Sequence, residues 1–223
     1  ILGWSESAYI IINEIIEANK SQQSGCIVIL GHKSNLEMQE KILHKINFDK
    51  ATRVIFRKGS TTSLADLEKL SIENAKSIII DIDDDIEVVK TILALFKNKE
   101  IKKKKIPIAC KISHSKNMQV AKIAGEGLVK FLPVYNFIGR IDAQACLQPG
   151  IAVVLLDLLD FSGSEVYFHY EESLVGKTYK KALVSYDTSC VVGIAKDELI
   201  LINPDAKTSI DKNDKLILIS LDD

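Results

Sequence analysis

The feature of this sequence that most constrains its fold is a repeated alternation of short, largely apolar segments with longer amphipathic ones. Short apolar segments of this kind are typical of strands that are buried on both faces of a sheet. After the first strand they cover residues 26–30, 53–56, 77–81, 106–112 and 127–131. The amphipathic segments between them predict helical crossovers. The sequence therefore predicts an α/β fold with a doubly wound, parallel, Rossmann-like sheet that helices cover on both faces.

The first eight residues have the pattern of a strand, a turn and the start of a helix, as in dinucleotide-binding units. In the G-x-G-x-x-G pattern, the second glycine lets the backbone approach a pyrophosphate and the third allows a helix to pack closely on a strand. Here Gly3 holds the first position, but Ser5 holds the second and Ala8 the third. Because Ser5 adds a side chain where the phosphates would lie, we predict a regulatory module rather than a dehydrogenase.

Two helices are expected after the sheet, over 136–147 and 151–159. They are separated by Gln148-Pro149-Gly150, where proline cannot continue a helix and glycine permits a turn. The second helix is apolar on nearly every side and therefore needs to be covered, either by another subunit or by a second lobe. The sequence thus predicts an obligate oligomer.

A change of pattern near residue 162 indicates a small C-terminal lobe. Short strands are expected over 165–169, 191–195, 199–202 and 215–221, with one short helix ending near Leu183. The predicted organisation is a Rossmann-like N-lobe over 1–135, a helical crossover and dimerisation segment over 136–161, and an α+β lobe over 162–223.

The composition is that of an ordinary globular protein: 223 residues, 47% hydrophobic and 26% charged, with a formal net charge of −1. This balance gives no electrostatic reason to expect nucleic acid or an acidic membrane surface as the main partner. No apolar run approaches the roughly 20 residues of a transmembrane helix. The chain has no initiator Met, and its first strand begins with only Ile1 and Leu2. We therefore expect native sequence upstream, with room there for a membrane segment.

Several other features predict no specific chemistry. No nucleophile and base stand in a recognisable catalytic context, so we do not expect an enzyme. The basic run 102–105 is expected to be a solvated loop. The cysteines are scattered and include no C-x-x-C pair, which favours buried, reduced thiols; they are Cys26, Cys110, Cys146 and Cys190.

Both lobes, in this order, resemble an RCK domain (regulator of potassium conductance). The segment from Gln148-Pro149-Gly150 to Phe161 resembles the family's helix–turn–helix crossover. Segments 174–178, 202–204 and 213–216 resemble its C-terminal lobe. Leu2-Gly3-Trp4 with 11–15, followed by 25–29 and 66–68, resembles the CASTOR/POLLUX branch of ion channels and its bacterial relatives. The resemblance covers essentially the whole chain.

This resemblance implies a ligand-sensing module at the cytoplasmic face of a membrane, which gates a potassium-type cation channel. It also implies a homo-oligomer whose dimers build a tetrameric or octameric ring, attached to a transmembrane pore domain upstream of residue 1, with no nucleic-acid partner. Two alternatives remain open: a peripheral regulatory subunit of a potassium transporter, and a nucleotide-dependent enzyme.

A nucleotide, if one binds, is expected at Gly3, Ser5, His32 and Lys33. RCK domains that bind a nucleotide usually carry an acidic residue at the end of the second strand, where a carboxylate accepts hydrogen bonds from a ribose. His32 and Lys33 stand there instead. This pair cannot replace a carboxylate, although it can attract a phosphate. The resemblance therefore argues against tight binding of NAD.

Calcium is the second ligand that the resemblance suggests. Some RCK domains hold it with an Asp at the end of the fourth strand and two carboxylates beside the fifth. Asp81 matches the first position, but Lys111 and Ser113 occupy the other two, so that site is expected to be broken. The acidic run that contains Asp81, Asp83 and Asp84 leaves a different calcium site open, since calcium takes six to eight oxygen ligands. The alternative is that Asp83 or Asp84 caps the next helix.

Overall fold

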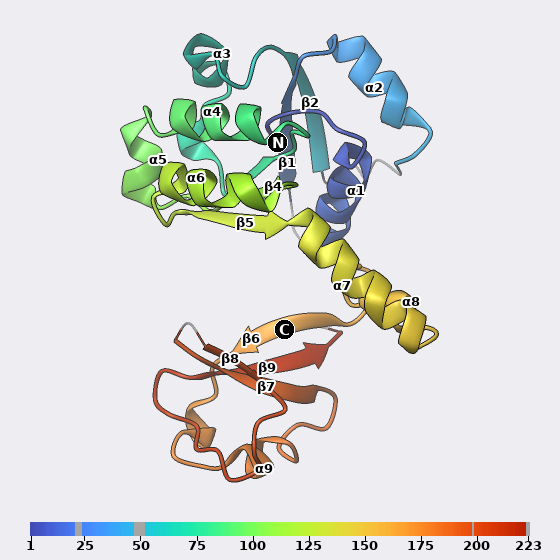
Figure 1. Cartoon of the computed structure of the whole chain (residues 1–223), viewed down its shortest axis with the longest axis vertical. Coiled ribbons are helices and arrows are strands. Elements are labelled where there is room, and N and C mark those ends of the chain that lie inside the picture. Colours follow the sequence, from blue (N-terminus) through green and yellow to red (C-terminus); the bar gives the residue numbers. More distant parts are fainter. Residues whose placement is uncertain (21–23, 47–51, 198, 222–223) are drawn as a thin grey trace. The chain divides into compact units, whose positions relative to one another are not determined.

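The computed structural model describes residues 1–20, 24–46, 52–197 and 199–221. The chain forms two compact units, Ile1–Gln148 (unit 1) and Pro149–Asp223 (unit 2) (Figure 1). The boundary falls at the proline–glycine turn, inside the segment 136–161. The finer division at residues 135 and 161 remains a prediction.

Unit 1 is built on a parallel sheet whose two halves are joined by one residue, Leu2. The strands β1 (Gly25–Gly31) and β2 (Thr52–Lys58) pair with each other, and β3 (Ile78–Ile80), β4 (Ile108–Ile112) and β5 (Val129–Pro133) form the other half. Leu2 forms parallel bridges to Leu30 of β1 and to Ile80 of β3. The order across the sheet is therefore β2, β1, residue 2, β3, β4, β5, and the prediction of a doubly wound sheet is confirmed.

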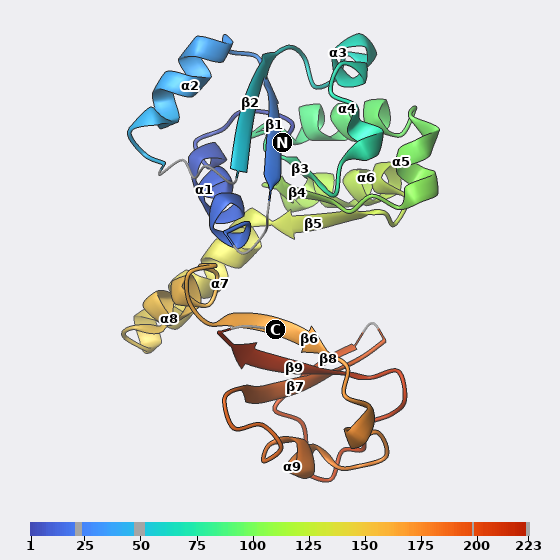
Figure 2. The same ribbon diagram turned by 180° about the vertical axis from the view of Figure 1, so that it is seen from behind.

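Helices cover both faces of this sheet, as the alternation of apolar residues along β1 shows. Ile29 packs in one core cluster with α1 (Ala8–Ala18) and α2 (Asn35–Leu43). The next residue, Leu30, belongs to the cluster on the other face. Figure 2 shows the same fold from behind. Besides α1 and α2, the described helices of unit 1 are α3 (Leu64–Glu68), η1 (Ile72–Asn74), α4 (Asp85–Leu95), α5 (Lys99–Lys104), α6 (Ser115–Gly125) and α7 (Val134–Leu147).

Unit 2 contains an antiparallel sheet in the order β6, β9, β7, β8. One face of the sheet packs on a core that includes the fully buried Tyr179. The elements of unit 2 are α8 (Ile151–Asp157), β6 (Glu165–His169), η2 (Glu172–Leu174), α9 (Tyr179–Ala182), β7 (Cys190–Lys196), β8 (Leu199–Ile202) and β9 (Lys215–Ser220). The prediction of a small α+β lobe is confirmed.

Two expectations from the sequence are wrong. The basic run lies mainly in α5 and is not a loop, because Asn98 caps this helix through the Glu100 amide (3.0 Å) and Ile101 is buried in the core. Only Cys110 is a buried thiol. The other three cysteines are exposed, since they lie on α7, which buries no residue, or near the starts of β1 and β7.

Candidate functional site

The turn after Leu2 is held close to the end of β3. The Leu2 carbonyl accepts a hydrogen bond from the Asp81 amide at 2.7 Å, and Gly3 has a φ of +104°. Ser5 then turns inward and is buried, so neither its amide nor its hydroxyl faces solvent as a phosphate donor would. Both groups donate to Asp81 instead: the Ser5 amide to Oδ2 at 3.1 Å and the Ser5 hydroxyl to Oδ1 at 2.7 Å.

Asp81, at the end of β3, is the centre of this arrangement, with only 1% of its surface exposed. The Ser7 hydroxyl adds a third hydrogen bond to Oδ1 at 2.8 Å. Burial by itself raises the pKa of Asp81, but the hydrogen bonds from Ser5 and Ser7 and the charge of Lys111 outweigh it and hold the pKa below its ordinary value. A buried, ionised carboxylate therefore accepts the hydrogen bonds that the turn after Leu2 donates.

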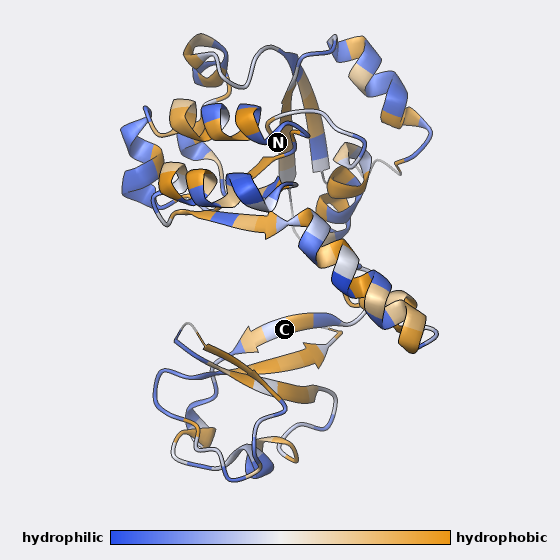
Figure 3. Cartoon of the chain, viewed as in Figure 1, coloured by the Kyte–Doolittle hydropathy of each residue, from blue (hydrophilic) through white to orange (hydrophobic). Residues whose placement is uncertain are grey.

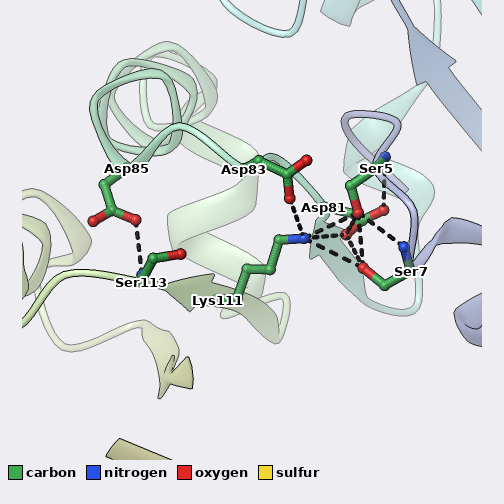
Figure 4. Close-up of polar contacts among 7 residues, drawn as sticks. All are labelled: Ser5, Ser7, Asp81, Asp83, Asp85, Lys111 and Ser113. Carbon is green, nitrogen blue, oxygen red and sulfur yellow. Dashed lines mark hydrogen bonds and ion pairs between the residues drawn. The ribbon is translucent and has the colours of Figure 1, made fainter. Parts of the chain in front are cut away.

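Lys111, from the end of β4, places its ammonium among four oxygen atoms (Figure 4). The Nζ atom lies 2.7 Å from Asp83 Oδ1 and 3.1 Å from Asp81 Oδ1. It also lies 2.9 Å from the Ser5 hydroxyl and 3.3 Å from that of Ser7. Partial burial by itself lowers the pKa of Lys111. The carboxylates of Asp83 and Asp81 outweigh this effect and raise the pKa above its ordinary value, so the side chain is held charged. Lys111 thus supplies the cation that balances Asp81 and Asp83.

A second buried carboxylate, Asp85, fixes the start of α4. It is 4% exposed and accepts hydrogen bonds from the Ser113 amide at 2.8 Å, the His114 amide at 2.9 Å and the Asn117 side chain at 2.8 Å. Burial raises its pKa, and these hydrogen bonds more than reverse that rise. The loop from Asp81 to Asp85 is therefore anchored at both ends, while Asp83 and Asp84 between them remain exposed.

A cavity of about 520 Å³ opens beside this loop, at the carboxyl ends of the strands. Its volume lies within the roughly 300–1,000 Å³ range of small-molecule sites. It is lined by the loops after residue 2, β1, β2 and β3 and by the first turn of α4: Gly3, Trp4, His32, Lys58, Gly59, Ser60, Thr61, Ile82, Asp83, Asp84 and Glu87. In doubly wound folds this edge of the sheet is where ligands bind.

The structure does not bring all four residues predicted for a nucleotide to one site. Gly3 and His32 line the cavity. Ser5 is buried against Asp81, and Lys33 lies near Lys41, which lowers the Lys33 pKa. The donors that would hold a pyrophosphate already serve a carboxylate, whose negative charge opposes a second anion there. This geometry adds to the case against a dinucleotide, although the nucleotide assignment itself remains a prediction.

The residues predicted for calcium have different roles. Asp81 and Asp83 are joined through the Lys111 ammonium, and Asp84 caps α4 by accepting from the Ile86 amide at 2.9 Å. Within the described part of the chain, no three His, Cys, Asp or Glu side chains are placed to hold a metal ion. Capping by Asp84 is one of the alternatives that the sequence left open, and calcium at these residues remains a prediction.

The sequence did not indicate Ser7, Asp85 or the role of Lys111. Lys111 was recognised only as a residue that breaks a calcium site. The available signal was its position: it lies at the carboxyl end of a buried strand, next to the strand that directly precedes Asp81. In a parallel sheet such residues meet at one edge, so a lysine there is a natural partner for the aspartate.

We expect Lys111→Met to lower the free energy of unfolding of unit 1 by about 2 kcal/mol, since a hydrogen bond to a charged group contributes about 1.5–3 kcal/mol. Met retains the apolar stem and removes only the ammonium. The matched control is Lys102→Met, which removes an exposed ion pair with Glu126 and should cost less than about 1 kcal/mol. Urea denaturation of both variants measures the difference; equal losses would contradict a special role for Lys111.

Comparison with known proteins shows that the chain is similar to parts of ion channels. Residues 4–108 match the RCK domain of the calcium-activated, slowpoke-like potassium channels, and residues 135–223 match a family described as Castor and Pollux, part of voltage-gated ion channel. The structure of the human SLO3 gating ring matches 99% of this chain and 44% of its own, with a TM-score of 0.66 at 15% identity. The fold and these matches define the class: the chain is an RCK domain.

Curated relatives identify the family within that class. The whole chain is 33% identical to the probable ion channel SYM8 of Pisum sativum and 34% identical to the ion channel POLLUX of Lotus japonicus. The calcium-gated potassium channel TvoK of Thermoplasma volcanium is 26% identical over 92% of this chain and 58% of its own. The chain belongs to the Castor/Pollux ion channel family. These relatives are ion channels, not enzymes.

The chain covers only part of these relatives, 26% of the pea protein and 25% of the Lotus protein. None of the helices in the described residues is both long enough and apolar enough to cross a bilayer.

Proposed function

We propose that this chain is the ligand-sensing module that gates a potassium-type cation channel from the cytoplasmic face of a membrane. The observation that carries the proposal is the match of the entire chain, through both units in the same order, to Castor/Pollux ion channels. The pore, in this proposal, belongs to another part of the same polypeptide.

The cavity is the site at which we propose that the ligand acts. Its lining comes from loops at the ends of β1, β2 and β3 and from α4, so a ligand there contacts several elements at once. The Asp81–Lys111 pair already ties the first turn, β3 and β4 together beside it. A ligand that binds one arrangement of these loops better than another shifts the population toward it, and assembly of the domains transmits that shift to the pore.

Assembly is supported by two helices that have no buried residue. In unit 1, α7 has no buried residue, and in unit 2, α8 has none. The apolar character of α8 is visible in Figure 3, and Leu156 on it is 69% exposed. Exposed apolar helix faces of this kind mark interaction sites. We propose that they form a dimer, and that dimers build a tetrameric or octameric ring.

We expect Leu156→Asp to weaken self-association of the chain at least tenfold, because a charge would have to be buried in the proposed interface. Light scattering over a concentration series measures the change. The matched control is Leu36→Asp on α2, where Leu36 is 65% exposed and lies outside the proposed interface. A strictly monomeric wild-type chain at tens of micromolar, or equal effects of the two variants, would contradict the proposal.

The gating role is tested with the same two variants in the full-length channel. Single-channel recordings in lipid bilayers should show a changed open probability for Leu156→Asp and an unchanged one for Leu36→Asp, with the same unitary conductance in all three proteins. Recordings with and without calcium, repeated on the double variant Asp83→Asn/Asp84→Asn, test the predicted calcium site. If Leu156→Asp disrupts association but leaves the open probability unchanged, the module does not gate the pore.

A further inference from the structure

The cavity beside Asp83 has two walls of opposite charge. Asp83, Asp84 and Glu87 form the acidic wall, which comes from the β3–α4 loop and the first turn of α4. Each of these carboxylates has one oxygen engaged within unit 1: Asp83 with Lys111, Asp84 with the Ile86 amide and Glu87 with the Thr61 hydroxyl at 3.3 Å. The arrangement holds the wall in place and leaves the second oxygen of each carboxylate for a ligand.

The opposite wall is basic and lies at the ends of β2 and β1. Lys58 is the last residue of β2, and His32 follows β1. The side chain of Lys58 forms no hydrogen bond or ion pair with another described residue, although Glu37 attracts it at longer range. Residue 2 and β1 separate β2 from β3, so the ends of these two strands stand three strand spacings apart, about 14 Å between backbones at about 4.8 Å each. The loop that follows Lys58 then approaches the acidic wall, where Thr61 meets Glu87.

Between the walls lie Gly3 and Trp4, which follow the residue that joins the two halves of the sheet. Trp4 is held edge-on against Phe56, with ring centroids 6.2 Å apart. Trp4 is thus the aromatic residue in the middle of the lining. The order from one wall to the other is therefore basic, aromatic, acidic.

The acidic wall already binds an ammonium group in this structure. The Lys111 Nζ atom lies 2.7 Å from Asp83 Oδ1, which is the geometry that a ligand's amino group would adopt on the neighbouring oxygens. The lining has three carboxylates and only one lysine, Lys58. Its net negative charge is unfavourable for a polyphosphate. An ammonium at one end and a single carboxylate at the other satisfy both walls.

We propose that this cavity binds a small zwitterion, an amino acid or short peptide whose amino group meets Asp83, Asp84 and Glu87 and whose carboxylate meets Lys58 and His32. The apolar middle of the ligand would pack on Trp4. The inference rests on the proposed function only in making this ligand the signal that the module senses; binding itself requires no pore.

Thermal-shift and calorimetric titrations of the chain test the charge pattern with simple probes. The probes are 4-aminobutyrate and 6-aminohexanoate, which carry both charges, and hexylamine and hexanoate, which carry one each. At least one of the two zwitterions should raise Tm and bind at least tenfold more tightly than either singly charged compound. ADP and NAD are run alongside. No response to either zwitterion, or a stronger response to ADP or NAD, overturns the proposal.

Two variants place the ligand in the cavity. Lys58→Met removes the basic end, and Asp84→Ser removes a charge while keeping a side chain that can cap α4. Each should weaken zwitterion binding at least tenfold. The control, Lys130→Met, removes an exposed lysine on β5, outside the cavity, and should leave binding unchanged. Equal binding by all variants overturns the proposal, whereas the recordings on Leu156→Asp would still decide whether the module gates a channel.

Discussion

Replacing Asp81 with asparagine is expected to lower the free energy of unfolding of unit 1 by about 3 kcal/mol, the lower end of the cost of breaking a buried ion pair. The amide has nearly the shape of the carboxylate, so packing changes little. It presents an N–H₂ group to donors that all need an acceptor, namely the Ser5 amide and the hydroxyls of Ser5 and Ser7. It also leaves Lys111 with one carboxylate in place of two. Thermal unfolding should show a loss of roughly 6–12 °C in Tm.

The pH dependence of stability tests whether the charge of Asp81 is responsible for this effect. The native state lowers the pKa of Asp81, so its contribution to stability is present above the ordinary aspartate pKa and is lost as the pH falls through the native value. The gap in stability between wild type and Asp81→Asn should therefore be full at neutral pH and narrow in strong acid. A gap that does not depend on pH would show that the charge of Asp81 is not what stabilises the turn.

The matched control is Asp83→Asn. Asp83 shares the Lys111 ammonium, but its side chain is 75% exposed. Exposed ion pairs contribute about 0–1 kcal/mol. A loss at Asp83 as large as that at Asp81 would mean that burial does not decide the energetics here.

Most of the fold was predictable because the parallel strands of unit 1 are short, largely apolar segments that alternate with amphipathic helical ones. In the antiparallel sheet of unit 2, the predicted segments 165–169 and 199–202 agree residue for residue with β6 and β8. The errors came where local pattern competes with packing. The run of lysines 102–105 was expected to be a loop, but Ile101, directly before it, is buried in the core and anchors a short helix.

The site was predictable only in part, because its contacts join residues far apart in the chain. Asp81 could be placed at the carboxyl edge of the sheet from its position after a strand. Ser5 reaches Asp81, where it meets Lys111, because Leu2 lies between β1 and β3. A strand that is reduced to one bridging residue leaves almost no periodic signal in the sequence. Asp85 looked like one more member of an acidic run, whereas it is buried by the loop after β4.

The Asp81–Lys111 pair also gives a physical reason why the module can keep its fold without a nucleotide at the first turn. In a dinucleotide-binding unit, phosphate oxygens satisfy the donors of that turn. Here the carboxylate of Asp81 takes these hydrogen bonds, and the ammonium of Lys111 balances the charge from within the chain. The donors of that turn are thereby satisfied from within the chain, and the cavity lined by Gly3 and Trp4 of the same turn is, in our proposal, the place where a different chemistry is recognised.

Gly3→Ala is expected to have the largest effect of any single substitution proposed for this chain, a loss of about 4 kcal/mol. Part of the cost is conformational, because a φ of +104° strains a residue with a side chain by about 1–3 kcal/mol. The rest is steric. A Cβ at Gly3 would lie 2.3 Å from the backbone oxygen of Asp81 and 2.5 Å from the Ile82 side chain. Overpacking of this kind costs about 1–3 kcal/mol, and backbone atoms cannot move aside as a flexible side chain does.

Gly127→Ala separates the two contributions. Gly127 also has a positive φ, +74°, but an added Cβ there meets nothing within 4 Å. Only the conformational cost of about 1–2 kcal/mol applies to it. Urea denaturation of both variants should therefore show a difference of about 2–3 kcal/mol, which measures the close approach of the first turn to β3. If that difference is found, Gly3 is required by the packing of Leu2 between two strands, and the surviving glycine of the G-x-G-x-x-G pattern is no evidence for a bound dinucleotide. If the two variants lose the same stability, the packing explanation fails.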